Sequence, residues 1–129
     1  MQNLAEIKKE NIRHEVMSQI QKAKNEILAT MDITEELKNP LPKKYFSLLH
    51  KKHKKGIKIK RVIFGSTKQY KHLLKEAIDK NLSFTGKHTK SKNYKKMIMI
   101  DKTKLFFRKR IKDKERFYFT TDNKYLEEY

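Results

Sequence analysis

The order of its apolar runs restricts this 129-residue chain more than any other feature of the sequence. Stretches with helical spacing alternate with strand-like runs in the first part of the chain, and strand-like runs follow one another near the end. Two strand–helix units followed by hairpins predict an α/β fold, with a mixed β-sheet flanked by helices on both faces. The length fits one domain, and we therefore expect a single domain over residues 1–129.

The N-terminal part of the chain has the pattern of an amphipathic helix. Ile12, Val16 and Ile20 recur at a spacing of four with polar residues opposite, and Leu4 extends the stripe toward the N-terminus. We therefore expect a long N-terminal helix over residues 4–26, which either packs on the sheet or projects from it.

Six apolar runs have strand character. They occupy residues 27–31, 57–64, 81–86, 96–101, 104–110 and 116–121. The first of these runs ends at Asp32 and Thr34, which are typical of a helix cap or a turn.

The segments between these runs indicate two further helices and a loop. One helix follows the break NPLP and ends at Gly56, and the other opens at Ser66 and Gln69, which fit a capping box. The segment GKHTKSKN is expected to be a polar, basic loop, and Asp122 is expected to cap a last helical turn.

The charge of the chain is strongly positive. The formal net charge is +18, and 33 residues are lysine or arginine. No acidic residue occurs in 37–75 or in 80–100. Such a field attracts polyanions, so we expect nucleic acid, DNA rather than RNA, or another polyanion as the partner. Arginine is scarce, which argues against bidentate base reading, and a lysine-rich proteome is the alternative explanation of the charge.

Several classes of protein are excluded or disfavoured by composition. The chain has no cysteine, which excludes disulfides and thiolate chemistry. No run approaches the roughly 18 consecutive apolar residues of a membrane span, and the N-terminus is no signal peptide, so we expect a cytoplasmic protein. No Walker A loop, dinucleotide fingerprint or zinc pattern is present, and we expect no cofactor.

The element order, with HKKGIKIKRVIFG between two helices and NYKKMIMIDKTKLFF near the end, resembles one half of the phospholipase D-like superfamily. It is similar to the degenerate members that form the effector domains of archaeal TrmB-type transcription regulators. Active members carry His-x-Lys, four residues and an aspartate, and then a Gly-Ser step; the histidine is the nucleophile and the lysine neutralises the phosphate.

The catalytic motif of that superfamily is degenerate in this chain. Lys96 and Asp101 keep its spacing, but Tyr94 stands in the histidine position and no Gly-Ser follows. The resemblance therefore implies a domain that is not an enzyme, because the covalent step lacks its nucleophile. A second His-x-Lys, at His88 and Lys90, has no aspartate at the required distance.

The best candidate for a polyanion site is formed by basic residues in two segments near the C-terminus. They are Lys87, His88, Lys90, Lys92, Lys95, Lys96, Arg108, Lys109 and Arg110. His50 and His53 have a spacing that can bind a metal, but the surrounding lysines repel a dication, so we expect no metal site. The aromatic residues at 106, 107 and 117–119 are expected to belong mainly to the core rather than to a base-stacking platform.

Three functions remain open from the sequence. The first is a non-catalytic phospholipase D-like domain that binds nucleic acid or another polyanion in a regulatory role, through its Lys-rich loops. The second is a ligand-sensing or dimerisation effector module like that of a TrmB-type regulator. The third is a residual phosphodiesterase or nuclease, which would have to act as a homodimer because one site needs two halves.

Overall fold

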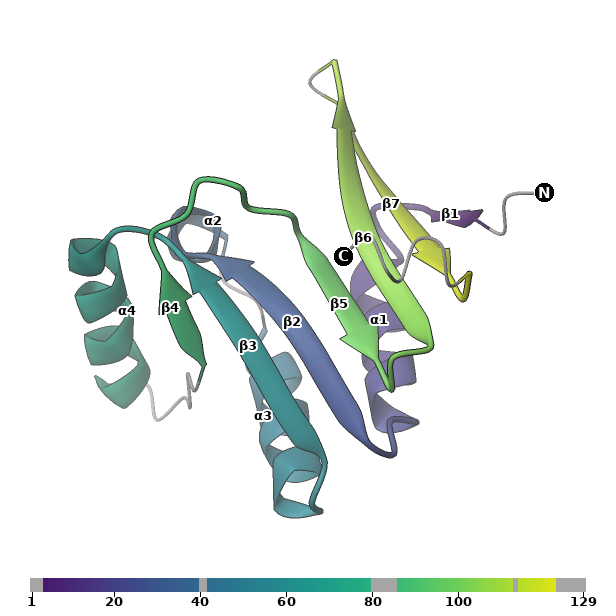
Figure 1. Cartoon of the computed structure of the whole chain (residues 1–129), viewed down its shortest axis with the longest axis horizontal. Coiled ribbons are helices and arrows are strands. Elements are labelled where there is room, and N and C mark those ends of the chain that lie inside the picture. The colour runs from purple at the N-terminus through teal and green to yellow at the C-terminus, as the bar shows by residue number, and fades with distance from the viewer. Residues whose placement is uncertain (1–3, 40–41, 80–85, 113, 123–129) are drawn as a thin grey trace.

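The computed structural model describes residues 4–39, 42–79, 86–112 and 114–122. Within them the elements are β1 (Leu4–Ile7), α1 (Ile12–Gln21), β2 (Glu26–Asp32), α2 (Ile33–Lys38), α3 (Lys43–Lys54), β3 (Lys58–Phe64), α4 (Thr67–Asp79), β4 (Lys87–Thr89), β5 (Met97–Ile100), β6 (Lys104–Ile111) and β7 (Lys114–Thr120) (Figure 1). This confirms the α/β class and a mixed sheet.

The seven described strands form one open sheet in the order β1-β7-β6-β5-β2-β3-β4. β2, β3 and β4 are parallel to one another, whereas all other neighbours pair antiparallel. The first and last described strands are therefore neighbours at one edge of the sheet, where β1 lies along β7 (Figure 1).

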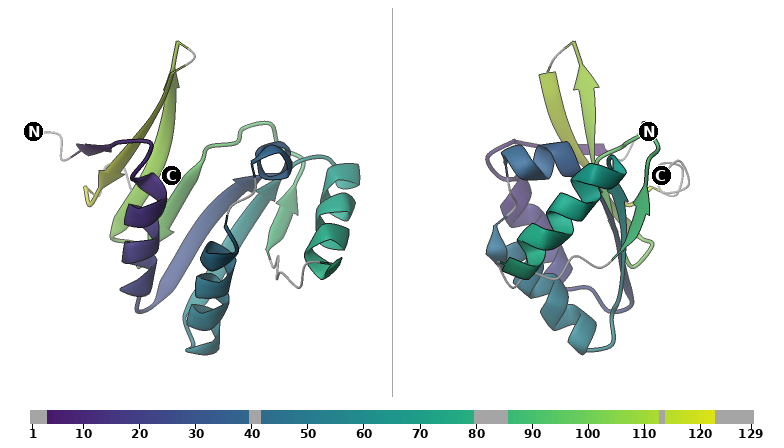
Figure 2. Two further views of the ribbon diagram at one scale, coloured as in Figure 1. Left: turned by 180° about the vertical axis from the view of Figure 1, so that it is seen from behind. Right: turned by 90° about the vertical axis from the view of Figure 1, so that its left-hand side faces the viewer.

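The helices of the described part lie on one side of the sheet, and the expectation of helices on both faces is wrong (Figure 2). The connections β2–α3–β3 and β3–α4–β4 step in the same direction along the sheet. Because parallel crossovers are right-handed, two steps in the same direction place their helices on the same face. The sequence gives the alternation of strands and helices but not the strand order, and the strand order decides the face.

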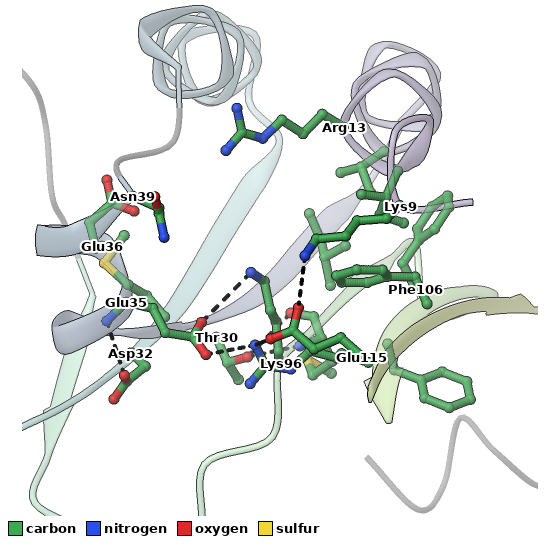
Figure 3. A pocket seen from close by; sticks show the side chains of 18 of the residues that line it. Lys9, Arg13, Thr30, Asp32, Glu35, Glu36, Asn39, Lys96, Phe106 and Glu115 are labelled. Carbon is green, nitrogen blue, oxygen red and sulfur yellow. Dashed lines mark hydrogen bonds and ion pairs between the residues drawn. The ribbon is translucent and has the colours of Figure 1, made fainter. Parts of the chain in front are cut away.

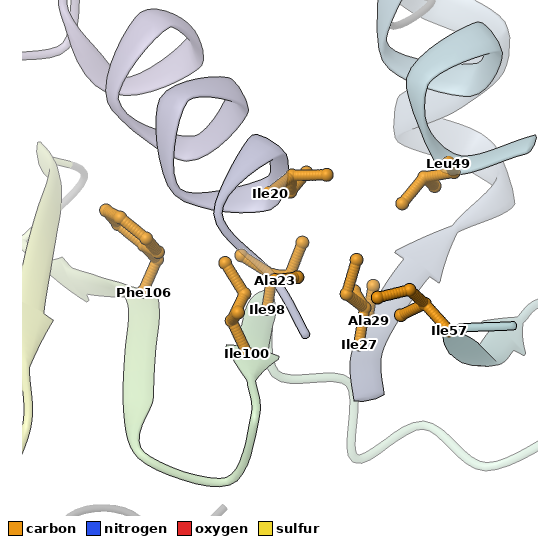
Figure 4. Close-up of a cluster of buried hydrophobic side chains, with 9 residues drawn as sticks. All are labelled: Ile20, Ala23, Ile27, Ala29, Leu49, Ile57, Ile98, Ile100 and Phe106. Atoms are coloured by element: carbon orange, nitrogen blue, oxygen red, sulfur yellow. The ribbon is translucent and has the colours of Figure 1, made fainter. Parts of the chain in front are cut away.

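The main core lies between this helix layer and the sheet. Ile27 and Ala29 of β2 are buried against Ile20 of α1 and Leu49 of α3, as Figure 4 shows. A neighbouring cluster continues along the same face and joins β2 and β3 to α3 and α4. Burying each large aliphatic side chain of this kind contributes about 1.5–3 kcal/mol to folding.

The face of the sheet away from the helices has its own apolar cluster. Met97, Leu105 and Phe107 are buried there, and Leu4 and Tyr118 pack against them. The aromatic residues of β6 and β7 are thus divided between the two faces, and buried Phe106, Phe107 and Phe117 confirm that these runs supply the core.

The predicted long N-terminal helix over 4–26 is wrong. Its first residues form β1, and only Ile12–Gln21 are helical. Leu4 and Ile7 lie three residues apart, so in a strand they point to opposite faces, and each meets a different apolar cluster. Pairing with β7 therefore partly buries both side chains and gives the backbone of this segment its hydrogen-bond partners. This stabilisation outweighs the helix preference that the apolar spacing indicates.

The predicted loop GKHTKSKN is wrong at its beginning, because Lys87–Thr89 form strand β4 beside β3. The start of this strand is tightly packed: a Cβ on Gly86 would lie 2.6 Å from the backbone oxygen of Arg61. The predicted strand at 81–86 lies almost wholly outside the described residues, and the helical turn after Asp122 lies wholly outside them.

Three local signals in the sequence are confirmed. The Asp32 side chain accepts a hydrogen bond from the Glu35 N–H at the start of α2. Ser66 and Gln69 form the reciprocal bonds of a capping box ahead of α4. Gly56 follows α3 with a φ of +91°, a conformation that glycine adopts without strain.

Candidate nucleic-acid interface

A cleft of about 960 Å³ opens on the helix side of the sheet, between α1, α2 and the strands β5, β6 and β7 (Figure 3). Charged side chains of both signs line it together with aromatic residues. Its cationic lining residues are Lys9, Arg13, Lys38, Lys96, Arg108 and Arg110, and its acidic ones are Glu10, Asp32, Glu35, Glu36 and Glu115. The two sets nearly balance, which sets this cleft apart from the strongly basic chain as a whole.

Glu35 is the centre of an ion-pair cluster in this cleft. Its carboxylate lies 2.6 Å from Arg108, 3.5 Å from Arg110 and 3.7 Å from Lys96. The Arg108 side chain is only 9% exposed, so its charge is largely removed from water and requires a close counter-ion.

Glu115 supplies the second carboxylate of the cluster. It lies 2.8 Å from Arg110 and 3.6 Å from Arg108, and Lys9 approaches it at 3.9 Å. The pKa of Glu115 is held below its usual value, chiefly by the hydrogen bond from Arg110. Glu35 therefore ties β6 to α2 by charge, and Glu115 ties β7 to β6.

Tyr94, which stands in the histidine position of the resembling motif, also lies at this cluster. Its hydroxyl donates a 3.5 Å hydrogen bond to Glu35, and Arg108 lies 5.7 Å from its ring centre. Burial raises the pKa of Tyr94 above its ordinary value, and the neighbouring Glu35 carboxylate raises it further. The phenol therefore stays protonated at neutral pH, and a protonated phenol is a poor nucleophile.

Asp101, the third motif position, lies at the other end of β5. It is five positions beyond Lys96, a distance of about 16 Å in an extended strand. Its carboxylate accepts backbone N–H bonds from Lys24, Asn25 and Glu26 at 3.0, 2.7 and 3.0 Å. The fold thus brings Tyr94 and Lys96 together and places Asp101 in a different, structural setting.

The predicted polyanion residues fall into separate groups. Lys96, Arg108 and Arg110 meet in the cleft, where Glu35 and Glu115 neutralise them. Lys109 lies on the opposite face of the sheet, with its ammonium 5.9 Å from the Phe107 ring centre. The predicted polyanion residues therefore do not form one continuous site.

Four of the predicted residues remain as exposed lysines at one end of the sheet. We call these the rim lysines: Lys87 on β4, and Lys90, Lys92 and Lys95 in the connection from β4 to β5. Figure 1 shows that this connection crosses the end of the sheet where β2 and β3 finish. Lys90 and Lys92 also line a smaller cleft of about 450 Å³, together with Ser66 and Thr67 at the start of α4.

His88, between these lysines, has a structural role in the fold. Its Nε2 lies 2.8 Å from the carbonyl oxygen of Gly65, so this nitrogen donates the hydrogen bond. The imidazole also stacks on Tyr70 at 4.4 Å between ring centres. The first contact fixes β4 to the turn before α4, and the second fixes it to α4 itself.

The described residues contain no group of three or more potential metal ligands. His50 and His53 are exposed on α3 among lysines, where no described carboxylate completes a site. No helix in the described part of the chain is long and apolar enough to cross a membrane.

Glu35 and Glu115 are the site residues that the sequence analysis missed. The pattern Asp32-x-x-Glu35 is an N-terminal helix signal that could have revealed α2. No local signal connects Glu35 with Arg108, because 73 positions separate them and only the sheet brings them together.

The sequence matches no protein-family model and no curated protein. The fold is similar to the solved structure of TrmBL2, described as an archaeal chromatin protein with a novel mode of DNA binding. The TM-score is 0.65 at 15% sequence identity, and the match covers 98% of this chain and 48% of the TrmBL2 chain. The chain therefore spans about half the length of that protein, and at this identity the similarity shows the fold alone.

The expected likeness to TrmB-type proteins thus has a structural counterpart. The assignment to the phospholipase D-like superfamily stays a prediction.

Proposed function

We propose that this chain is a non-catalytic domain that binds nucleic acid, duplex DNA in preference to RNA, in a regulatory role, and that the rim lysines contact its phosphates. One observation carries the proposal: the acid-free segment 80–100 leaves four exposed lysines at one end of the sheet. The carboxylates of Glu35 and Glu115 are already paired in the neighbouring cleft.

The similarity to TrmBL2 supports the same proposal. That protein is described as a chromatin protein that binds DNA, and this chain has the fold of about half of it. The lysine excess fits contacts with phosphate rather than with base edges, because an ammonium is a point charge without the planar fork of arginine.

The test compares two variants with the same net charge. K87Q/K90Q/K92Q removes three rim lysines, and K51Q/K54Q/K55Q removes three exposed lysines from the end of α3, at the opposite end of the sheet (Figure 1). Both changes lower the formal net charge from +18 to +15. Binding of a labelled DNA duplex is measured for each protein across a salt series.

The rim variant should bind more weakly, and its slope of log affinity against log salt should fall by about 2.7, at roughly 0.9 for each lost phosphate contact. The α3 variant should keep nearly the wild-type slope. Equal losses in both variants would mean that the charge acts only as a diffuse field, and the proposed site would be wrong.

The non-catalytic part of the proposal is supported by the motif positions. Tyr94 is held protonated, and Asp101 is engaged by the backbone at the far end of β5. We expect no turnover of a simple phosphodiester by the wild-type protein. Turnover that disappears in Lys96→Ala would overturn this expectation and favour the residual phosphodiesterase.

A second candidate function is the sensing of a small polar ligand in the large cleft. Its volume of about 960 Å³ suits a ligand of ordinary size, and its lining offers charges of both signs beside Tyr94 and Phe106. A ligand that binds only the folded state raises the midpoint of thermal unfolding. A rise that is lost in Arg110→Gln would identify this cleft as the site. Self-association stays a prediction from the sequence.

A further inference from the structure

The β6–β7 hairpin extends beyond the rest of the sheet. β5 last pairs with β6 at Phe107, and β1 last pairs with β7 at Phe117. The pairs Lys109–Arg116, Arg110–Glu115 and Ile111–Lys114 join β6 and β7 only to each other. At about 3.4 Å per residue, this two-stranded ribbon projects by about 10 Å, and Figures 1 and 2 show it standing clear of the body.

The charges of the ribbon are sorted between its two faces. Arg110 and Glu115 are cross-strand partners on the face toward the cleft, where they pair with each other. The opposite face presents Lys109, Lys114 and Arg116, all of them exposed. Arg116 alone of these three has a described carboxylate within ion-pair distance, Glu6 at 3.8 Å. One face of the ribbon is thus cationic.

The turn at the tip contains two residues of opposite charge, Lys112 and Asp113. Lys112 is exposed and has a φ of +48°, as one of the two residues that connect Ile111 to Lys114.

We infer that this ribbon enters the major groove of duplex DNA, an inference that rests on the proposed function and specifies its partner. The major groove of B-DNA is about 12 Å wide and about 8.5 Å deep and admits a two-stranded β-ribbon. A projection of about 10 Å is sufficient to reach into that depth. The rim lysines lie at the same end of the sheet as the ribbon (Figure 1), where they contact the flanking phosphates.

Insertion of the ribbon into the major groove predicts that the protein distinguishes duplex DNA from duplex RNA. The major groove of A-form RNA is deep and too narrow for protein side chains to read. A ribbon that enters the groove therefore binds duplex DNA better than duplex RNA, whereas lysines that only neutralise phosphates bind both at comparable strength.

The experiment uses the hairpin variant K109Q/K112N/K114Q in the full chain, with asparagine at 112 because it tolerates a positive φ. K51Q/K54Q/K55Q is the control of equal charge. Affinities for DNA and RNA duplexes of equal length are measured at one salt concentration, and circular dichroism checks that each protein is folded.

The wild type and the control should prefer DNA by at least about tenfold, and the hairpin variant should bind both duplexes within a factor of about two. An unchanged preference in the hairpin variant would overturn the groove inference. If the rim variant still lost DNA affinity in that case, the proposed function would stand without the groove inference. If neither the rim nor the hairpin variant lost DNA affinity, both proposals would fail.

Discussion

At the scale of single residues, Asp101, which stands at the aspartate position of the resembling motif, has a structural role in the fold. Its backbone has a φ of +54°, and its carboxylate accepts three backbone N–H groups from the segment that leads into β2. Partial burial by itself would raise the pKa of Asp101, but the N–H groups of Glu26, Lys24 and Asn25 outweigh it and lower that pKa below its ordinary value. The charged carboxylate therefore stabilises the junction between β5 and β2.

Replacing Asp101 by asparagine should lower the free energy of unfolding by about 1–2 kcal/mol at neutral pH, because the charge and one acceptor oxygen are lost. The folded-state pKa is depressed, so the stabilisation is complete above the unfolded-state pKa of about 3.9. It disappears as the pH falls through the folded-state value. Denaturant unfolding of both proteins at pH 7 and near pH 3 measures the difference.

That difference should shrink markedly at the lower pH. Lys102→Gln, an exposed neighbour in the same turn, is the control and should show no comparable pH dependence. A constant gap between wild type and D101N at both pH values would contradict the role given to the carboxylate.

Glu35 represents the opposite case, a residue that no motif marks. It offers one carboxylate to Arg108, Arg110, Lys96 and the hydroxyl of Tyr94. Burying the Arg108 guanidinium without this carboxylate would lower the stability of the fold, because a buried charge needs a counter-ion. The acidic residues of the cleft meet this need in a chain that has few of them. The importance of Glu35 arises from its position in space and not from its neighbours in the chain.

At the scale of elements, α4 depends on its first turn. The hydroxyl of Ser66 accepts the Gln69 N–H at 3.1 Å, and the Gln69 side chain accepts the Ser66 N–H at 3.0 Å. Gln69 also donates to the hydroxyl of Thr34 in α2 at 2.9 Å. The cap therefore joins two helices as well as starting one.

Replacing Ser66 by alanine should destabilise the fold by about 1 kcal/mol, because an N–H of the first turn loses its partner. The control is Ser47→Ala on the exposed side of α3, where alanine is the better helix former and stability should stay the same or rise slightly. The midpoints of urea unfolding are compared for wild type and the two variants. Equal midpoints for S66A and wild type would show that water replaces the cap without cost.

At the scale of the whole molecule, the charge acts on folding as well as on binding. A net charge of +18 over 129 residues makes the folded chain repel itself, since the exposed lysines far outnumber the ion pairs that could offset them. Salt screens such repulsion over a Debye length of about 8 Å at 0.15 M.

Raising the salt concentration from about 0.02 to 0.3 M should therefore raise the thermal unfolding midpoint by several degrees. The rise should be smaller for K51Q/K54Q/K55Q, which carries three fewer positive charges. Differential scanning calorimetry with sodium chloride gives the measurement. A midpoint that falls with salt would mean that the ion pairs of the Glu35 cluster outweigh the general repulsion.

Local order was largely predictable from the sequence. Apolar runs predict the strands β2, β3, β5, β6 and β7. Single residues with short-range contacts predict the caps of α2 and α4 and the end of α3. These features depend on contacts within a few positions of the chain. The charge balance could also be read without a structure, because it depends on composition alone.

Only the tertiary structure decided what depends on strand order. Pairing with β7 turned the predicted start of a helix at Leu4 into strand β1, and β3 made a strand of Lys87–Thr89. The direction of two crossovers placed the helices on one face. The same order brought Glu35 to Arg108 and separated Asp101 from Lys96, because contacts between distant segments depend on how the whole sheet assembles.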